Sequence, residues 1–94
     1  MSGDEHFPFK QIRLEENLVS RTFNMDVDAS ELVWHIDRED RVVKVVEGDS
    51  WYIQMDNELP RKLIEGKEYF IPKMSFHRII KGTSNLILEI KMLK

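Results

Sequence analysis

Residues 35–48 read HIDREDRVVKVVEG, and residues 66–77 read GKEYFIPKMSFH. The first segment has the spacing His-x-Asp-x3-Arg-x6-Gly, and the second has the spacing Gly-x5-Pro-x4-His. Together they contain two imidazoles and one carboxylate, on His35, Asp37 and His77. A small β-barrel can gather such side chains around one ion, so the pattern predicts a barrel with a metal site.

The length and composition predict one small folded domain. Ninety-four residues hold too little apolar material for two separate cores. A composition of 41% hydrophobic and 33% charged residues is typical of a globular protein rather than a disordered one. The chain has no cysteine, so no disulfide can stabilise so small a core. We therefore expect a homodimer, in which a buried face adds to the stability of each copy.

The charge pattern argues against two classes of partner. The net charge is −3 and acidic and basic residues are interleaved, so no extended field would attract nucleic acid or an anionic membrane. No segment approaches the roughly 20 apolar residues of a membrane span, and the first residues lack the features of a signal peptide. We expect a cytoplasmic protein with a small-molecule ligand, and neither nucleic acid nor membrane as a partner.

Short apolar segments separated by turn residues predict strands along most of the chain. The clearest is residues 86–93, where every second residue from Leu86 to Met92 is apolar and would share one face of a strand. We predict that residues 1–17 form an N-terminal arm or edge strand and that residues 18–94 form a single barrel. The predicted strands are residues 18–27, 32–37, 41–47, 51–55, 63–64, 69–71, 76–80 and 86–93.

Almost no part of the chain has helical periodicity. Residues 28–31, DASE, have the spacing of a capping box, which predicts a single helical turn at most. Short strands at regular intervals with so little helix indicate an all-β sandwich or barrel.

The first quoted segment resembles the first motif of the cupins, a family of double-stranded β-helix or jelly-roll barrels. That motif runs Gly-x5-His-x-His-x3 or 4-Glu-x6-Gly. His35 falls on its first histidine and Gly48 on its closing glycine. The chain departs from the motif at two ligand positions, because Asp37 stands at the second histidine and Arg41 at the glutamate.

The second quoted segment resembles the second cupin motif, Gly-x5-Pro-x-Gly-x2-His-x3-Asn. Gly66, Pro72 and His77 match it, whereas Met74 stands at its second glycine and Lys81 at its asparagine. The resemblance covers residues 32–93. It implies an all-β fold, a cupin-type double-stranded β-helix in one compact domain.

The resemblance also implies that His35, Asp37 and His77 bind a divalent transition metal, namely Fe, Mn, Zn or Ni. Residues i and i+2 of a strand share a face, so His35 and Asp37 point the same way and His77 would join them from an adjacent strand. Two imidazoles and one carboxylate with open positions form the facial triad that binds Fe(II) in oxygen-activating enzymes. His6 lies in a charged N-terminal segment, and we do not expect it to be a ligand.

Two further residues are candidates for contact with the bound molecule. Alternation with Val43 and Val45 places Arg41 inside the barrel, where two roles are open to it. It can pair with Asp37 and withdraw that carboxylate from the metal, or it can hold the carboxylate or phosphate of a ligand. Trp51 is expected inside the barrel near its mouth, where it serves as a core residue or contacts the ligand.

Two functions remain open at this point. The first is an enzyme with dioxygenase- or isomerase-like chemistry, in which the metal activates a small polar or anionic molecule that Arg41 anchors. The second is a non-catalytic barrel that binds or sequesters a small molecule or serves in assembly, with Asp37 paired to Arg41 and no metal. Nothing supports a nucleophilic hydrolase, because cysteine is absent and Ser75 lacks the glycines of a nucleophile elbow.

Overall fold

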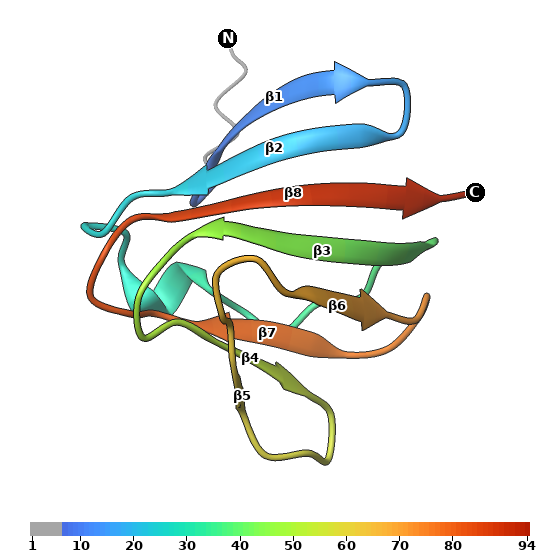
Figure 1. The fold of residues 1–94 in the computed structure, drawn as a ribbon. Helices are drawn as coiled ribbons and strands as arrows, with labels where there is room; N and C mark the ends of the chain where they lie inside the picture. The colour runs from blue at the N-terminus through green and yellow to red at the C-terminus, as the bar shows by residue number, and fades with distance from the viewer. Residues whose placement is uncertain (1–6) are drawn as a thin grey trace, which may run out of the picture.

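The computed structural model describes residues 7–94 and consists of two antiparallel β-sheets around a common core (Figure 1). Residues 1–6 lie outside the described part of the chain, and with them His6 and the beginning of the predicted arm. The elements in chain order are β1 (Lys10–Glu15), β2 (Leu18–Phe23), η1 (Ala29–Glu31), β3 (Asp40–Glu47), β4 (Tyr52–Met55), β5 (Arg61–Lys62), β6 (Glu68–Ile71), β7 (His77–Ile80) and β8 (Leu86–Leu93).

Strands that are far apart in the sequence lie next to one another in the sheets, as in a barrel. The larger sheet has the order β1-β2-β8-β3-β6, and the smaller sheet has the order β5-β4-β7. The last strand, β8, therefore lies between β2 and β3, with Ile90 opposite Val19 on one side and opposite Val43 on the other (Figure 1). The all-β prediction is confirmed. β1 lies at the edge of the larger sheet, next to β2.

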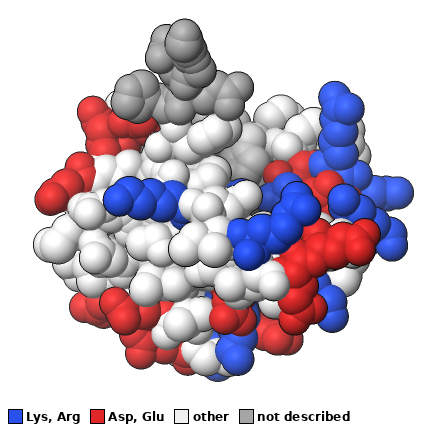
Figure 2. Space-filling model, turned by 90° about the horizontal axis from the view of Figure 1, so that it is seen from above, with Lys and Arg blue, Asp and Glu red and all other residues white. Residues whose placement is uncertain are grey.

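The alternation predicted for residues 86–93 is confirmed by their burial. Leu86, Leu88 and Ile90 are at most 4% exposed and point into the core, between residues that are more exposed. Ile53 of the smaller sheet and Leu63, the residue after β5, belong to the same core. The outer face of the barrel carries acidic and basic side chains next to one another, as the view from above shows (Figure 2).

One end of the barrel is closed by Trp51, which is fully buried just before β4. Its indole Nε1–H donates to the carbonyl oxygen of Ser84 at 2.8 Å, and its ring centroid lies 5.9 Å from that of Phe23. Gly82 packs so closely on the backbone oxygen of Asp49 and on the indole that a Cβ atom there would overlap with both. This turn therefore requires glycine.

Three of the predicted strands differ from the structure. The strand predicted at residues 18–27 ends at Phe23 as β2. Residues 32–37 form no strand, and only His35 makes an isolated bridge there, because exposed apolar side chains such as Val33, Trp34 and Ile36 follow one another without alternation. The short strand predicted at residues 63–64 lies two residues earlier, as β5, where Arg61 and Lys62 pair with β4.

The single helical turn predicted after residue 28 is present as η1. Asp28 precedes it, and its side chain accepts a hydrogen bond from the backbone N–H of Ser30 at 3.0 Å. Nowhere in residues 7–94 is there a helix with the length and apolar character needed to span a membrane.

Candidate metal centre

The two motif histidines are held side by side through their backbones. His77 begins β7, whereas His35 lies in the irregular segment between η1 and β3. Their backbones form an antiparallel bridge in which both N–H···O distances are 3.0 Å, and their ring centroids lie 4.2 Å apart. His77 is 3% exposed, but the side chain of His35 is 45% exposed. One imidazole therefore belongs to the core and the other is accessible from outside.

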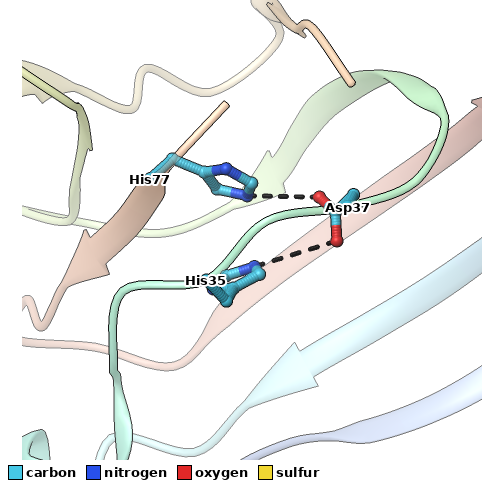
Figure 3. Close-up of side chains that lie close together, drawn as sticks. All are labelled: His35, Asp37 and His77. Atoms are coloured by element: carbon cyan, nitrogen blue, oxygen red, sulfur yellow. Dashed lines mark ion pairs between the residues drawn. The ribbon is translucent and has the colours of Figure 1, made fainter. Parts of the chain in front are cut away.

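Asp37 completes a group of three with its carboxylate directed at both rings (Figure 3). Its Oδ2 atom lies 3.2 Å from Nε2 of His77, and its Oδ1 atom lies 4.0 Å from Nε2 of His35. One candidate ligand atom from each residue lies within 4.8 Å of the others. The structure thus brings together the three residues that the sequence predicted as ligands.

Hydrogen bonds to the backbone determine which ring nitrogen of each histidine carries the proton when the ring is neutral. Nδ1 of His35 lies 3.2 Å from the carbonyl oxygen of Val33, and Nδ1 of His77 lies 2.9 Å from that of Ser75. A carbonyl oxygen only accepts, so each neutral ring carries its proton on Nδ1 and a lone pair on Nε2. The Oδ2 atom of Asp37 is buried and has no hydrogen-bond donor within the described residues. Electron-rich atoms gathered in this way fit a cation, and the Nδ1–H bonds are those of metal-binding histidines.

The surroundings also favour the protonation states that a metal requires. Burial acts to raise the pKa of Asp37, but a hydrogen bond from His77, formed when its Nε2 carries a proton, and the positive charge of Arg41 outweigh it, so the pKa is lowered. Burial is the largest cause that lowers the pKa of His35, and the neighbouring His77 ring adds to it. An ionised carboxylate and a neutral imidazole are the forms that bind metal ions.

Arg41 lies inside the barrel, as alternation along its strand predicted, and it contacts Asp37. Its Nη1 atom is 3.4 Å from Oδ1 of Asp37. Its Nε donates to Oε2 of Glu39 at 2.7 Å, and Nη2 lies at the same distance from that oxygen. The pairing with Asp37 uses Oδ1 and leaves Oδ2 for a metal, so the two predicted roles of this carboxylate are compatible. Most of the guanidinium is bound to Glu39 and not directed at a ligand.

A cavity of about 430 Å³ adjoins the three candidate ligands. This volume is in the range of sites for small molecules, which are mostly apolar with a few polar groups. The wall comes from both sheets, with Val43 and Leu88 from the larger and Ile53 and Ile79 from the smaller. The charged or ionisable side chains that line it are Arg21, Glu31, His35, Asp37, Arg41 and His77.

Arg21 is the cavity residue that the interpretation of the sequence missed. It lies on β2 between Val19 and Phe23, which are 4% and 5% exposed, and it shares their inward face. The signal was present, since the alternation that directs Val19 and Phe23 inward must direct Arg21 inward as well. Burial and the nearby charge of Arg41 lower its pKa to about 10, although Asp37 acts in the opposite direction.

Trp51, the other residue expected near a ligand, does not line this cavity. Its ring is enclosed at the end of the barrel where β4 begins, and its only polar group is bonded to Ser84. We therefore assign Trp51 to the core.

Solved structures with the same arrangement of strands identify the fold. A cupin-2 domain-containing protein from Shewanella frigidimarina matches with a TM-score of 0.67 at 24% identity, over 96% of this chain and 84% of that one. A cupin domain from Bordetella pertussis matches with a TM-score of 0.65 at 16% identity, over 98% of this chain and all of that one. The chain has the cupin fold. The resemblance seen in the two sequence motifs is thereby confirmed for the fold.

Other cupin-fold matches are larger proteins. The structure of Fe(II)-HppE with the alternative substrate (S)-1-HPP matches with a TM-score of 0.63 at 19% identity over 90% of this chain, which spans 48% of that protein. No family model matches the chain, and no curated protein matches it. The cupin barrel is thus shown by its backbone, and its chemistry must be argued from its own side chains.

Proposed function

We propose that this chain binds a divalent transition metal through His35, Asp37 and His77, and that it binds or acts on a small polar or anionic molecule in the adjoining cavity. The carrying observation is that Nε2 of each neutral ring presents a lone pair toward a carboxylate whose buried Oδ2 has no donor within residues 7–94. A cation would satisfy all of these atoms together. The Fe(II) in the HppE structure, which has the same fold, supports a metal.

The residues around the triad have separate roles in this proposal. Backbone carbonyls hold the rings of His35 and His77 with Nε2 directed at the site. Arg41, itself bound to Glu39, holds one oxygen of Asp37 and leaves the other free. When bound, the metal supplies a Lewis acid with open positions, and Fe, Mn, Zn and Ni all suit this donor set. Dioxygenase- or isomerase-like chemistry is the catalytic form of this function.

Elemental analysis of protein purified without a nickel column tests the metal site. We expect near-stoichiometric metal in the wild type and its loss in His35→Ala and in His77→Ala. His6→Ala is the matched control, because it removes an imidazole that we do not expect to bind metal. Absence of metal after addition of Fe(II), Mn(II) or Zn(II) to the folded wild type would refute the proposal.

A metal-free binding barrel is the second candidate, and the contact of 3.4 Å between Arg41 and Asp37 favours it. In this case the ion pair and a protonated His77 satisfy the carboxylate, and the cavity alone carries the function. Native mass spectrometry of freshly isolated protein separates the two candidates, because this one predicts a retained small molecule without metal. Metal in the isolated protein excludes it.

A further inference from the structure

Arg21 carries a positive charge inside the barrel that no described residue neutralises. Its Nε and Nη2 atoms donate to Oε1 of Gln11 at 2.9 and 2.7 Å, and its guanidinium carbon lies 3.9 Å from the centroid of the Phe9 ring. Gln11 is a neutral amide, and within residues 7–94 Arg21 forms no ion pair and its Nη1 donates no hydrogen bond. A guanidinium has five N–H donors, so the edge that includes Nη1 is left for another acceptor.

The second arginine of the cavity shows what a neutralised guanidinium looks like in this barrel. Arg41 lines the same cavity, but it contacts the carboxylates of both Glu39 and Asp37. The two arginines of the cavity thus differ in their partners. Arg41 contacts two carboxylates, whereas Arg21 contacts none among the described residues. A buried charge is costly unless an opposite charge accompanies it. Arg21 therefore has the character of a ligand-binding group.

Arg21 and the three candidate metal ligands face one cavity. The side chains of Arg21, His35, Asp37 and His77 all belong to its lining. Between these polar groups the cavity wall is apolar, with Leu88 and Ile79 among its residues. A molecule that occupies the cavity would therefore meet a cation, a hydrocarbon surface and the triad.

We propose that Arg21 anchors the carboxylate of a small organic acid whose apolar body lies in the cavity beside the metal triad. This inference rests on the proposed function only in taking the cavity as the ligand site. A planar guanidinium edge matches a carboxylate through two parallel hydrogen bonds, and the apolar wall suits a hydrocarbon body. Arg21, rather than Arg41, is then the residue that selects an anionic ligand.

An NMR titration of metal-free protein with hexanoate tests the anchor, with 1-hexanol as the uncharged ligand of equal length. We expect about millimolar affinity of the wild type for hexanoate, as is usual for so small a ligand. Arg21→Gln should bind hexanoate about tenfold more weakly or worse, and Arg21→Lys should lie between the two. Hexanol should bind the wild type and Arg21→Gln equally. Lys44→Gln, which removes an exposed charge on the outer face of β3, should bind hexanoate like the wild type.

Equal hexanoate binding by the wild type and Arg21→Gln, or no saturable binding by the wild type, would overturn the proposal. Thermal unfolding checks that each variant is folded. If Arg21→Gln does not fold, the comparison of hexanoate binding between the wild type and Arg21→Lys tests the proposal. Calorimetric titration of the same proteins with Mn(II) separates this proposal from the metal site. Mn(II) binding that survives in Arg21→Gln while hexanoate binding is lost supports both. Hexanoate binding that depends on Arg21, in a protein that binds no Mn(II), supports the anchor and refutes the metal site.

Discussion

The two ends of the barrel differ in whether their buried polar atoms have hydrogen-bond partners. At one end the indole N–H of the fully buried Trp51 donates to the carbonyl oxygen of Ser84 at 2.8 Å. At the other end Oδ2 of Asp37 is buried beside His77 and has no donor among the described residues. A buried polar atom without a partner costs about 1–3 kcal/mol of stability. The first end thus stabilises the fold, and the second keeps an unsatisfied group that a ligand can use.

The pairing of β4 with β7 places these features at opposite ends of the same two strands. Tyr52, next to Trp51, lies opposite Ile80, whereas Met55 lies opposite His77. The separation matters because core packing at one end can hold the strands in register while the other end stays poorly satisfied. We therefore expect changes at the Trp51 end to alter stability and changes at the Asp37 end to alter metal binding.

Trp51→Ala tests this division with the largest expected effect. Removing a buried aromatic side chain costs about 3–5 kcal/mol in the free energy of unfolding, measured by urea denaturation. Metal content per folded molecule should remain that of the wild type. Trp51→Phe serves as the milder variant if Trp51→Ala does not fold. Loss of metal from a folded variant with a small loss of stability would contradict the separation of the two ends.

Asp37→Asn tests the unsatisfied atoms at the other end. An asparagine amide could accept from Arg41 through its oxygen and donate to Nε2 of His77 through its nitrogen, so a new hydrogen bond would offset the lost charge of the carboxylate. We expect the free energy of unfolding of the metal-free variant to stay within about 1 kcal/mol of the wild type. Metal affinity should fall more than about 100-fold, measured by calorimetry.

A clear loss of stability in metal-free Asp37→Asn would contradict the assignment of the proton to Nδ1 of His77. It would mean that the carboxylate already receives a hydrogen bond from a protonated ring. Asp40→Asn is a useful control, because Asp40 accepts a hydrogen bond from the backbone N–H of Lys73 and belongs to no ligand set. It removes the same charge from the same part of the chain.

The sequence was sufficient to predict the barrel and to name the triad, for identifiable reasons. Strict alternation in residues 86–93 leaves one face for burial, and β8 buries that face. His35 and His77 meet because their backbones bridge directly, although residues 32–37 are not the expected strand. Two backbone hydrogen bonds can thus hold a candidate ligand in place even where the segment forms no regular strand.

Other parts of the site could not be predicted because they depend on packing between distant strands. Alternation could direct Arg41 inward, but only the folded chain shows that Glu39 contacts its Nε and Nη2 atoms. The significance of Arg21 was equally hidden, because only the folded chain shows that, within residues 7–94, its side-chain partner is the neutral Gln11 and not a carboxylate. The sequence left open whether Trp51 is a core residue or contacts the ligand, and its burial and its bond to Ser84 assign it to the core.

The metal end should contribute to the pH dependence of stability near neutral pH. Burial and the His77 ring lower the pKa of His35 below its ordinary value of 6.5, so the unfolded chain takes up the proton more readily. The free energy of unfolding of metal-free protein should then fall as the pH drops through about 6.5 toward the lower folded pKa. The lowered pKa of Asp37 acts with the same sign at more acidic pH, where its contribution is lost.

Urea unfolding of His35→Gln over about pH 8 to 5.5 measures this contribution. The variant should lose less stability than the wild type across this interval, and His6→Gln should behave as the wild type. An unchanged pH slope in His35→Gln would assign the dependence to other groups. The effect should be modest, because the side chain of His35 is 45% exposed and remains partly hydrated.

Arg41→Gln is the finest test of the metal end, with an expected gain of about three- to tenfold in metal affinity. Arg41 places a positive charge 3.4 Å from Oδ1 of Asp37, where it competes with a cation for that carboxylate. Glu39 loses its partner in the variant, but its side chain is 23% exposed and can be hydrated.

Arg38→Gln removes the same charge from an exposed position three residues away, so calorimetric titration of both variants with Mn(II) distinguishes local from general electrostatics. A gain confined to Arg41→Gln means that Arg41 opposes the metal, and the polar end of the barrel then binds its cation against a neighbouring charge. A loss in Arg41→Gln would mean instead that Arg41 orients Asp37 for the metal. In that case the pairing at 3.4 Å is part of the site, although Oδ2 of Asp37 has no donor within residues 7–94.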